Sequence, residues 1–320
     1  MVRPRYLPDN FTLTLLSVVA LATLLPARGA LAGALDVATQ LGIGLLFFLH
    51  GAKLSREAVV AGAAHLRLHA LIFACTFGLF PLLGLLLRPV LTPLVGADLY
   101  RGLLYVCALP ATVQSAIAFT SIARGNIPAA VCSAAASSLF GVFMTPLLVA
   151  LLLGVEGQGG GSLLDAIRKI GVQLLLPFVL GQVARGFIGP WVVRNKDWIR
   201  YVDQGSILLV VYAAFSSAVI AGLWHQVPPL SLAGLVIACS VLLGLALLGT
   251  HLLGRALGFG IEDRITILFC GSKKSLATGV PMAQVLFAGQ SLGLLLLPLM
   301  LFHQIQLMVC AALAARFAKR

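Results

Sequence analysis

Apolar segments long enough to cross a lipid bilayer follow one another along almost the entire chain. About 20 residues of helix cross a hydrocarbon core of about 30 Å, and ten segments of roughly that length alternate with short polar connections. Inside lipid every backbone N–H and C=O group must find a partner within the protein, so these segments are expected to be helices. The sequence therefore predicts an all-α polytopic membrane protein, with spans at about 10–26, 35–52, 66–88, 99–122, 127–154, 166–184, 203–223, 230–254, 264–288 and 290–315.

The composition agrees with burial in lipid. Hydrophobic residues make up 60% of the 320 residues and charged residues 10%, whereas soluble domains carry about 25% charged residues. The mean hydropathy is +1.04. The first apolar segment follows Arg3 and Arg5 and precedes small residues, a pattern also found in cleaved signal peptides. Because many further spans follow, we interpret this segment as an uncleaved first helix.

Lysine and arginine are distributed unequally between the two sides of the predicted membrane. With a cytoplasmic N-terminus, 15 of the 22 basic residues fall on the cytoplasmic side, 5 on the opposite side and 2 within a span. Cytoplasmic connections of membrane proteins are enriched in these residues. We therefore expect an even number of spans in the cytoplasmic membrane, with both termini in the cytoplasm. The net charge of +12 is scattered over short connections, so the lipid bilayer rather than nucleic acid is the expected partner.

Ten spans divide into two sets of five, 1–154 and 155–320, within a single integral membrane domain. An odd number of spans places the two sets in opposite orientations, as an inverted repeat requires. Spans 4 and 9 hold matching places, and each is interrupted and polar at its centre. The interruptions read Leu109-Pro-Ala-Thr-Val-Gln-Ser-Ala-Ile-Ala-Phe-Thr120 and Gly271-Ser-Lys-Lys-Ser-Leu-Ala-Thr-Gly-Val-Pro281. Corresponding broken segments in two halves indicate a transport site.

Lys273 and Lys274 lie at the centre of span 9, where an ammonium group costs roughly 2.5–3.5 kcal/mol on insertion scales. None of the 10 acidic residues falls near the centre of a predicted span. Backbone carbonyls at the helix breaks, water or an anionic substrate could balance the charge, or one amine could be uncharged, because an apolar medium disfavours the ammonium form. Adjacent residues on a helix point about 100° apart, so only one lysine is expected to face a cavity. The alternative is a re-entrant tip with both lysines in water, which the short flanking apolar runs disfavour.

Other polar residues in and beside the broken spans could line the same cavity. Each could equally serve helix packing, since serine and threonine bond to their own helix or to the next one. Gln114 is the strongest of these candidates, because a buried amide needs several hydrogen-bond partners, and His303 could relay protons or simply be packed. The serines of span 5 lie on a small-residue face that is expected to pack closely against a broken helix. The candidate substrate or ion site comprises Gly271, Ser272, Lys273, Lys274, Ser275, Thr278, Pro281, Gln284, Pro110, Thr112, Gln114, Ser115, Thr120, Ser133, Ser137 and His303.

Motifs for other functions are missing from the sequence. It has no metalloprotease, Walker-type or G-x-S-x-G motif, so no catalytic residue is expected. The six cysteines lie within apolar segments, with no Cys-x-x-Cys pair and no metal-ligand spacing. No metal, disulfide framework or other cofactor is therefore expected.

At the two broken spans the chain resembles the bile acid:sodium symporter family, and most of all the branch typified by solute carrier family 10 member 7 with its bacterial SBF-like relatives. The resemblance covers nearly the entire chain. It rests on Pro110-Ala-Thr-Val-Gln-Ser115 with Ala123-Arg-Gly-Asn126, on Phe269-Cys-Gly-Ser-Lys-Lys-Ser-Leu-Ala-Thr-Gly-Val-Pro281, and on Phe48-Leu-His-Gly-Ala-Lys-Leu54. It implies ten helices in two inverted five-helix repeats, in which spans 4 and 9 unwind and cross. Spans 1, 2, 6 and 7 would form a panel domain beside a core domain, and an organic anion would be carried by alternating access.

The resemblance also implies where sodium binds in sodium-coupled members, and this sequence departs from that pattern. Span 9 of those members carries an acidic residue before a Gly-x-Gln-Asn sequence, and hydroxyls on span 5 complete the site. The corresponding positions here are Phe269, then Lys273 and Lys274, with Ala130 and Ala134 on span 5. Sodium requires oxygen ligands, and an ammonium group repels it. We therefore expect a secondary transporter of a small organic anion without classical sodium coupling.

Two roles are open for the lysine pair. One lysine could replace the cation electrostatically, either holding the crossing together or changing charge so that protons are coupled; pH-dependent transport would then be lost when both lysines become alanine. Alternatively, a lysine could contact the anion directly, and Lys273→Gln or Lys274→Gln would weaken binding at every pH. A sodium-coupled symporter, a regulatory membrane protein of calcium entry or trafficking, and a membrane enzyme are the remaining alternatives. A monomer is expected to suffice, because both repeats complete the site within one chain.

Overall fold

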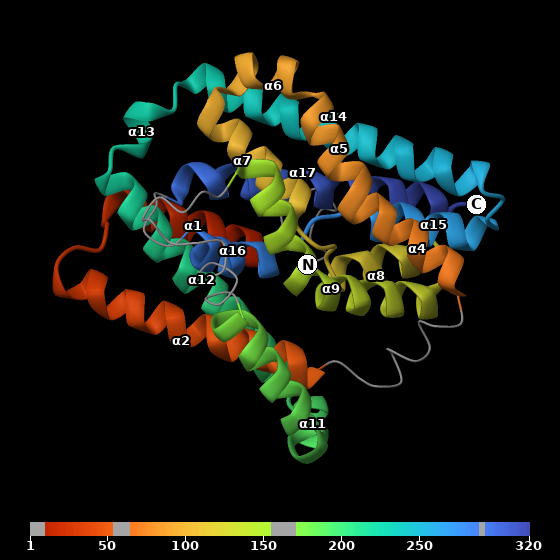
Figure 1. The fold of residues 1–320 in the computed structure, drawn as a ribbon, viewed down its shortest axis with the longest axis horizontal. Coiled ribbons are helices and arrows are strands. Elements are labelled where there is room, and N and C mark those ends of the chain that lie inside the picture. The colour runs from red at the N-terminus through yellow and green to blue at the C-terminus, as the bar shows by residue number, and fades with distance from the viewer. Residues whose placement is uncertain (1–9, 54–64, 155–170, 288–291) are drawn as a thin grey trace, which may run out of the picture. The chain divides into compact units, whose positions relative to one another are not determined.

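The computed structural model describes residues 10–53, 65–154, 171–287 and 292–320 (Figure 1). These residues form helices and turns and contain no β-strand. Seven of the described helical segments are long and apolar enough to cross a membrane: Ala30–Lys53, Leu66–Leu86, Ile127–Leu153, Val172–Arg194, Lys196–Ile220, Pro229–Ala256 and Gly293–Ala318. The chain is thus a polytopic integral membrane protein, as its apolar segments predict.

The chain divides into two compact units, and each unit draws on both halves of the sequence. Unit 1 comprises Met1–Ser55, Glu156–Val227 and Val280–Leu296, and unit 2 comprises Arg56–Val155, Pro228–Gly279 and Leu297–Arg320. Unit 1 therefore contains predicted spans 1, 2, 6 and 7, which is the set that the resemblance assigns to a panel domain. The ten-span inverted repeat, 1–154 against 155–320, stays a prediction.

Unit 1 is built on two pairs of packed helices. Helix α1 (Asn10–Leu24) packs on α12 (Lys196–Ile220), and α2 (Ala30–Lys53) packs on α11 (Leu176–Arg194); the π-helix η3 (Gly171–Leu175) precedes α11, and the short α13 (Leu223–Gln226) follows α12. Figure 1 shows α11 crossing α2. Glycine permits this close crossing, because a Cβ at Gly51 would overlap the carbonyl oxygen of Phe178 and one at Gly181 would overlap that of Phe48.

Unit 2 holds both broken spans. Its helices are α4 (Leu66–Ala74), the π-helix η2 (Cys75–Leu79), α5 (Phe80–Leu86), α6 (Arg88–Val95), α7 (Ala97–Ala108), α8 (Gln114–Ile122), α9 (Ile127–Leu153), α14 (Pro229–Ala256) and α15 (Ile261–Gly271). The first residues of α16 (Leu276–Leu286) and most of α17 (Gly293–Ala318) also belong to it. Helix α15 packs against α4, α8, α9 and α14, which surround it in Figure 1.

The predicted spans overlap described helices, but several bounds differ, and residues 166–170, 288 and 290–291 of the predicted spans lie outside the described residues. Predicted span 7 begins at 203, whereas α12 already begins at Lys196. Spans 4 and 9 are each divided into two short helices, as their glycine and proline residues predict. Span 6 was predicted to end at residue 184, which is wrong, because α11 continues to Arg194. Arg185, just beyond the predicted end, lies within α11 and donates to the carbonyl of Ala52 at 3.1 Å. The π-helix η2 inside span 3 and the short helix α6 have no counterpart in the prediction.

Candidate substrate and ion site

Helix α7 ends at the first break because Pro110 cannot donate the next helical hydrogen bond. A proline also disfavours helical backbone angles in the residue before it, and Leu109 adopts an extended conformation with φ −75° and ψ 153°. The N–H of Leu109 turns back to the carbonyl of Val106 at 3.2 Å. The carbonyls at the end of α7 must therefore find partners outside their own helix.

Helix α9 supplies a partner for one of these carbonyls and for one N–H beyond the break. Thr145 Oγ1 donates to the carbonyl of Ala108 at 2.8 Å, and Ser137 Oγ accepts from the N–H of Ala111 at 3.0 Å. Gly141 lies directly against Pro110, since a Cβ there would come within 2.6 Å of the proline ring. The prediction that the small-residue face of span 5 packs closely against a broken helix is confirmed.

The second break separates α15 from α16 and is held by Gln306 of α17. Gln306 Oε1 accepts from the N–H of Lys274 at 2.9 Å, and Gln306 Nε2 donates to the carbonyl of the same residue at 2.8 Å. The second hydrogen of Nε2 reaches Nδ1 of His303 at 2.8 Å. At the end of α15, Ser272 Oγ donates to the carbonyl of Leu268 at 2.6 Å. One side-chain amide thus satisfies both backbone groups of Lys274, where no helix can do so.

The two breaks meet and are joined by hydrogen bonds to the main chain. The N–H of Ser275 donates to the carbonyl of Pro110 at 2.9 Å. Tyr105 Oη of α7 donates to the carbonyl of Gly279 in α16 at 2.6 Å. The approach is close, because a Cβ at Gly279 would come within 2.5 Å of the Leu109 side chain. Spans 4 and 9 therefore contact each other at their interrupted centres.

The ammonium group of Lys274 is enclosed by main-chain oxygen atoms. Its side chain is 0% exposed, and Nζ donates to the carbonyls of Thr76 at 2.7 Å, Cys107 at 2.9 Å and Leu109 at 2.7 Å. An ammonium group has three N–H donors, so all of them are used. The ring of Phe80 adds a cation–π contact, with its centroid 4.2 Å from Nζ. We call these three carbonyl oxygens the carbonyl cage.

The π-helix explains why one oxygen of the carbonyl cage is available. The N–H of Phe80 donates to the carbonyl of Cys75, five residues back, rather than to that of Thr76. The next residue is Pro81, which has no N–H to offer. The carbonyl of Thr76 therefore has no helical donor and accepts from Lys274 instead. Single π turns within α-helices occur frequently at functional sites.

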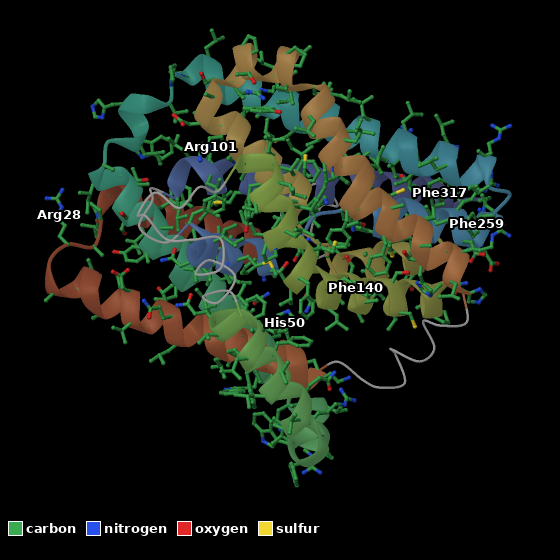
Figure 2. The ribbon with its side chains drawn as sticks, in the orientation of Figure 1. Arg28, His50, Arg101, Phe140, Phe259 and Phe317 are labelled. Carbon is green, nitrogen blue, oxygen red and sulfur yellow. The ribbon has the colours of Figure 1, made fainter. Side chains whose placement is uncertain are left out.

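Lys273 is equally buried but lacks hydrogen-bond acceptors. Its side chain is 0% exposed, and Nζ has no hydrogen-bond partner among the described residues. Instead, Nζ lies 3.8 Å from the ring centroid of Phe119 and 5.9 Å from that of Phe269. Phe317, labelled in Figure 2, packs edge-on against Phe269 with centroids 6.5 Å apart. These rings belong to an apolar cluster with Ala123, Ile265, Leu268, Leu247, Cys310, Leu313 and Ala314.

Neither lysine is paired with a carboxylate in the part of the chain that the structure describes. The two ion pairs found there join Lys53 to Asp203 and Arg200 to Asp197, both in unit 1. The same residues contain no group of three or more His, Cys, Asp or Glu side chains that could hold a metal ion. The charge of Lys274 is met by carbonyl dipoles, and that of Lys273 only by ring faces.

Unit 2 brings most of the predicted site residues into or beside the crossing. Ser115 bonds to Thr112 at 2.8 Å, the N–H of Thr278 donates to Ser275 Oγ at 3.3 Å, and Ser133 bonds to His69 at 2.7 Å. Thr120 is buried on α8. A Cβ at Gly271 would come within 3.2 Å of Cys75.

Three predicted residues lie elsewhere than the prediction suggested. Gln114 is exposed at the start of α8, so the argument from a buried amide does not apply to it. Pro281 and Gln284 fall in the part of α16 that belongs to unit 1, and the Oε1 atom of Gln284 is buried there without a partner.

Sequence reasoning missed the residues that hold the two lysines. Gln306, Thr76 and Phe119 act through contacts between segments far apart in the chain. The pair Phe80-Pro81 inside an apolar span was the one local signal, because a mid-helix proline leaves a carbonyl without its donor.

Comparison with known proteins assigns the chain to a family. A family model described as the SBF-like CPA transporter family matches residues 9–319. The chain is 68% identical over 320 residues to the uncharacterized protein PA2026 of Pseudomonas aeruginosa, covering 100% of this chain and 96% of that relative. It is 55% identical over 312 residues to the Escherichia coli protein named "Putative symporter YfeH", covering 98% and 93%. It is 28% identical over 310 residues to sodium/bile acid cotransporter 7 of Danio rerio, covering 95% and 91%.

The family match and the geometry concern the same segments. The Lys-Lys sequence and the two broken spans lie inside the matched residues. The names of two of these relatives describe membrane transport, which agrees with the apolar helices. Since the family model matches nearly the full length, the chain belongs to the SBF-like CPA transporter family.

Proposed function

We propose that this protein is a secondary active transporter of a small organic anion that works by alternating access and needs no sodium. Two relatives are named as a symporter and as a sodium/bile acid cotransporter, which supports coupled transport of a solute and an ion. In the same proposal, both termini are cytoplasmic, one chain suffices, and the two halves form an inverted repeat in the cytoplasmic membrane. The side-chain caps from Ser137 and Gln306 at the two breaks support that repeat.

The observation that carries the proposal is the buried amine of Lys273, whose Nζ has no hydrogen-bond partner among the described residues. A lysine at mid-membrane costs roughly 2.5–3.5 kcal/mol, and a desolvated cation–π contact returns about 2 kcal/mol. The rings of Phe119 and Phe269 therefore leave the charge incompletely balanced. A carboxylate or sulfonate group would complete that balance with a charge-assisted hydrogen bond. In this proposal Lys273 binds the carboxylate or sulfonate group of the substrate.

Lys274 supports the sodium-independent part of the proposal. Its ammonium occupies the oxygens offered by the crossing, so a second cation would meet repulsion rather than free ligands. In this proposal protons are the favoured coupling ion, and sodium coupling is the alternative that the experiment below decides.

The test is counterflow of radiolabelled taurocholate, and of a panel of smaller carboxylates and sulfonates, into proteoliposomes in sodium chloride or choline chloride. We expect one of these anions to be carried at equal rates in both salts. Lys273→Gln should raise its KM by about tenfold or more, since a hydrogen bond to a charged group is worth about 1.5–3 kcal/mol. Lys196→Gln, which removes an exposed lysine of unit 1, is the matched control and should leave KM unchanged. Flux that requires sodium, or a KM indifferent to Lys273→Gln, would contradict the assignment.

A further inference from the structure

The carbonyl cage is made of oxygens that the backbone leaves without donors whether or not Lys274 is present. The carbonyl of Thr76 loses its helical donor to the π turn and to Pro81. The carbonyl of Cys107 would accept from the N–H of Ala111 in a continuous helix, but that N–H donates to Ser137 Oγ. The carbonyl of Leu109 lies beyond the end of α7, in extended backbone. The cage is therefore a property of the fold rather than of the lysine.

Three convergent carbonyls with an aromatic face form a chemically defined site. Rings of backbone carbonyls replace the hydration shell of monovalent cations in selective channels. Here the ring of Phe80 closes a further side, 4.2 Å from the cation it contacts. The oxygens are neutral and no carboxylate is paired with the group in the described residues, so the site suits a single positive charge better than a divalent ion.

The size of the cage also limits its occupants. The three N···O distances are 2.7, 2.9 and 2.7 Å. Calcium takes its oxygen ligands at about 2.3–2.6 Å, and sodium is close to calcium in ionic radius. The longer distances fit ammonium and potassium ions better than sodium, and much better than lithium.

The charge of Lys273 should repel a free cation in the carbonyl cage no more than it repels the ammonium group of Lys274. Lys273 points to the rings of Phe119 and Phe269 on α8 and α15, whereas the cage lies over Phe80, beside η2 and the end of α7. The titratable groups near the cage are the thiols of Cys75 and Cys107, which flank or supply its oxygens. The fold already accommodates one positive charge in the cage together with that of Lys273.

We propose that the carbonyls of Thr76, Cys107 and Leu109 form a monovalent-cation site of the main chain, which the ammonium of Lys274 fills as a tethered occupant. If the tether is removed without filling its volume, a free cation of ammonium or potassium size takes its place, and the folded state comes to depend on that ion. The inference goes beyond the proposed transport activity and holds whichever solute the protein carries.

The experiment is thermal unfolding of full-length Lys274→Ala in nanodiscs, in chloride salts of ammonium, potassium, sodium, lithium and choline at constant ionic strength. A ligand that binds only the folded state raises Tm in proportion to the logarithm of its concentration above Kd. We expect a rise of several degrees with ammonium and potassium that grows with the logarithm of their concentration, a smaller rise with sodium, and none with lithium or choline. The wild type should be indifferent to the same series.

Two further variants separate a cation site from a general salt effect. Lys274→Met fills the same volume with an apolar chain and should show no dependence on the cation. Pro81→Ala in the Lys274→Ala background restores an N–H that can donate to the carbonyl of Thr76, and it should weaken the ammonium effect at least several-fold in apparent Kd. Because Tm is measured without transport, this test of the cation site remains valid even if the proposed transport function fails.

Either of two results would overturn the inference. One is a folded Lys274→Ala protein whose Tm is the same in all five salts, or rises equally in Lys274→Met. The other is a Lys274→Ala protein that cannot be recovered folded in ammonium or potassium chloride, because the proposal requires these ions to restore the site.

Discussion

Lys273 and Lys274 are adjacent in the chain and equally buried, yet their surroundings are opposite. Every N–H of the Lys274 ammonium meets a carbonyl that its own helix cannot satisfy. The Lys273 ammonium meets ring faces and has no acceptor among the described residues. We therefore expect the buried Lys274 side chain to stabilise the fold and the buried Lys273 side chain to cost stability. Replacing each lysine by a residue of similar length should therefore change Tm in opposite directions.

The largest expected effect is that of Lys274→Met. The substitution leaves three buried carbonyls without a donor, and each unsatisfied group costs about 1–3 kcal/mol. The free energy of unfolding should fall by more than about 3 kcal/mol, seen as a large drop in Tm of the purified protein in nanodiscs.

Lys273→Met is the matched control and should leave Tm unchanged or raise it. It replaces an unpartnered buried cation by an apolar side chain of similar volume, a change that is often neutral or stabilising. Equal losses of Tm in Lys274→Met and Lys273→Met would show that the two lysines contribute alike to stability and would contradict the proposed contrast.

The next effect concerns the amide that holds the second break. Gln306→Leu removes three hydrogen bonds and leaves the N–H and carbonyl of Lys274 unsatisfied, so we expect a loss of about 2–4 kcal/mol in the free energy of unfolding. Gln284→Leu removes an amide whose Oε1 is already unpartnered and should cost clearly less. Chemical denaturation followed by tryptophan fluorescence measures both, and a reversed order would show that Gln306 does not hold the break.

The contrast between the lysines also marks what a sequence can reveal. Burial of the pair, the interruption of spans 4 and 9 and the packing role of Ser137 follow from local patterns: apolar length, glycine and proline, and small-residue spacing. The division of roles between the lysines does not, because it depends on which carbonyls lack donors. That in turn requires knowing that Ser137 takes the N–H of Ala111 and that a π turn precedes Pro81.

The errors have the same physical origin. The prediction for Gln114 requires a buried amide, but Gln114 is the first residue of α8 after the break and is exposed. The predicted end of span 6 at 184 is followed by Arg185, whose guanidinium reaches the carbonyl of Ala52 within the continuing helix α11. That contact joins segments far apart in the chain, which a local pattern does not show.

A smaller effect compares glycines at the two breaks. Gly141→Ala would place a Cβ 2.6 Å from the rigid ring of Pro110, so a loss of about 1–3 kcal/mol is expected from overpacking. Gly279→Ala would meet the ends of the Leu109 and Leu299 side chains, which can shift, and should cost less.

Gly44→Ala is the control for these two variants. It lies in α2 with nothing within 4 Å of the added Cβ, and it should be neutral or gain up to about 1 kcal/mol from helix propensity. If Gly279→Ala proved more harmful than Gly141→Ala, the second break would be the more tightly packed of the two.

The smallest expected effect is the response of the wild type to sodium. Lys274 occupies three main-chain oxygens of the crossing, and its charge would repel a second cation there. Tm in sodium chloride and in choline chloride should therefore agree at matched ionic strength over pH 5.5 to 9. Sodium at 100 times its Kd would add about 2.7 kcal/mol to the free energy of unfolding, so this measurement would detect a sodium site. A rise of Tm that is specific to sodium would indicate a cation site beside the lysines and would support sodium coupling. Agreement between the two salts, together with a large loss in Lys274→Met, would leave the lysine as the cation on which the crossing depends.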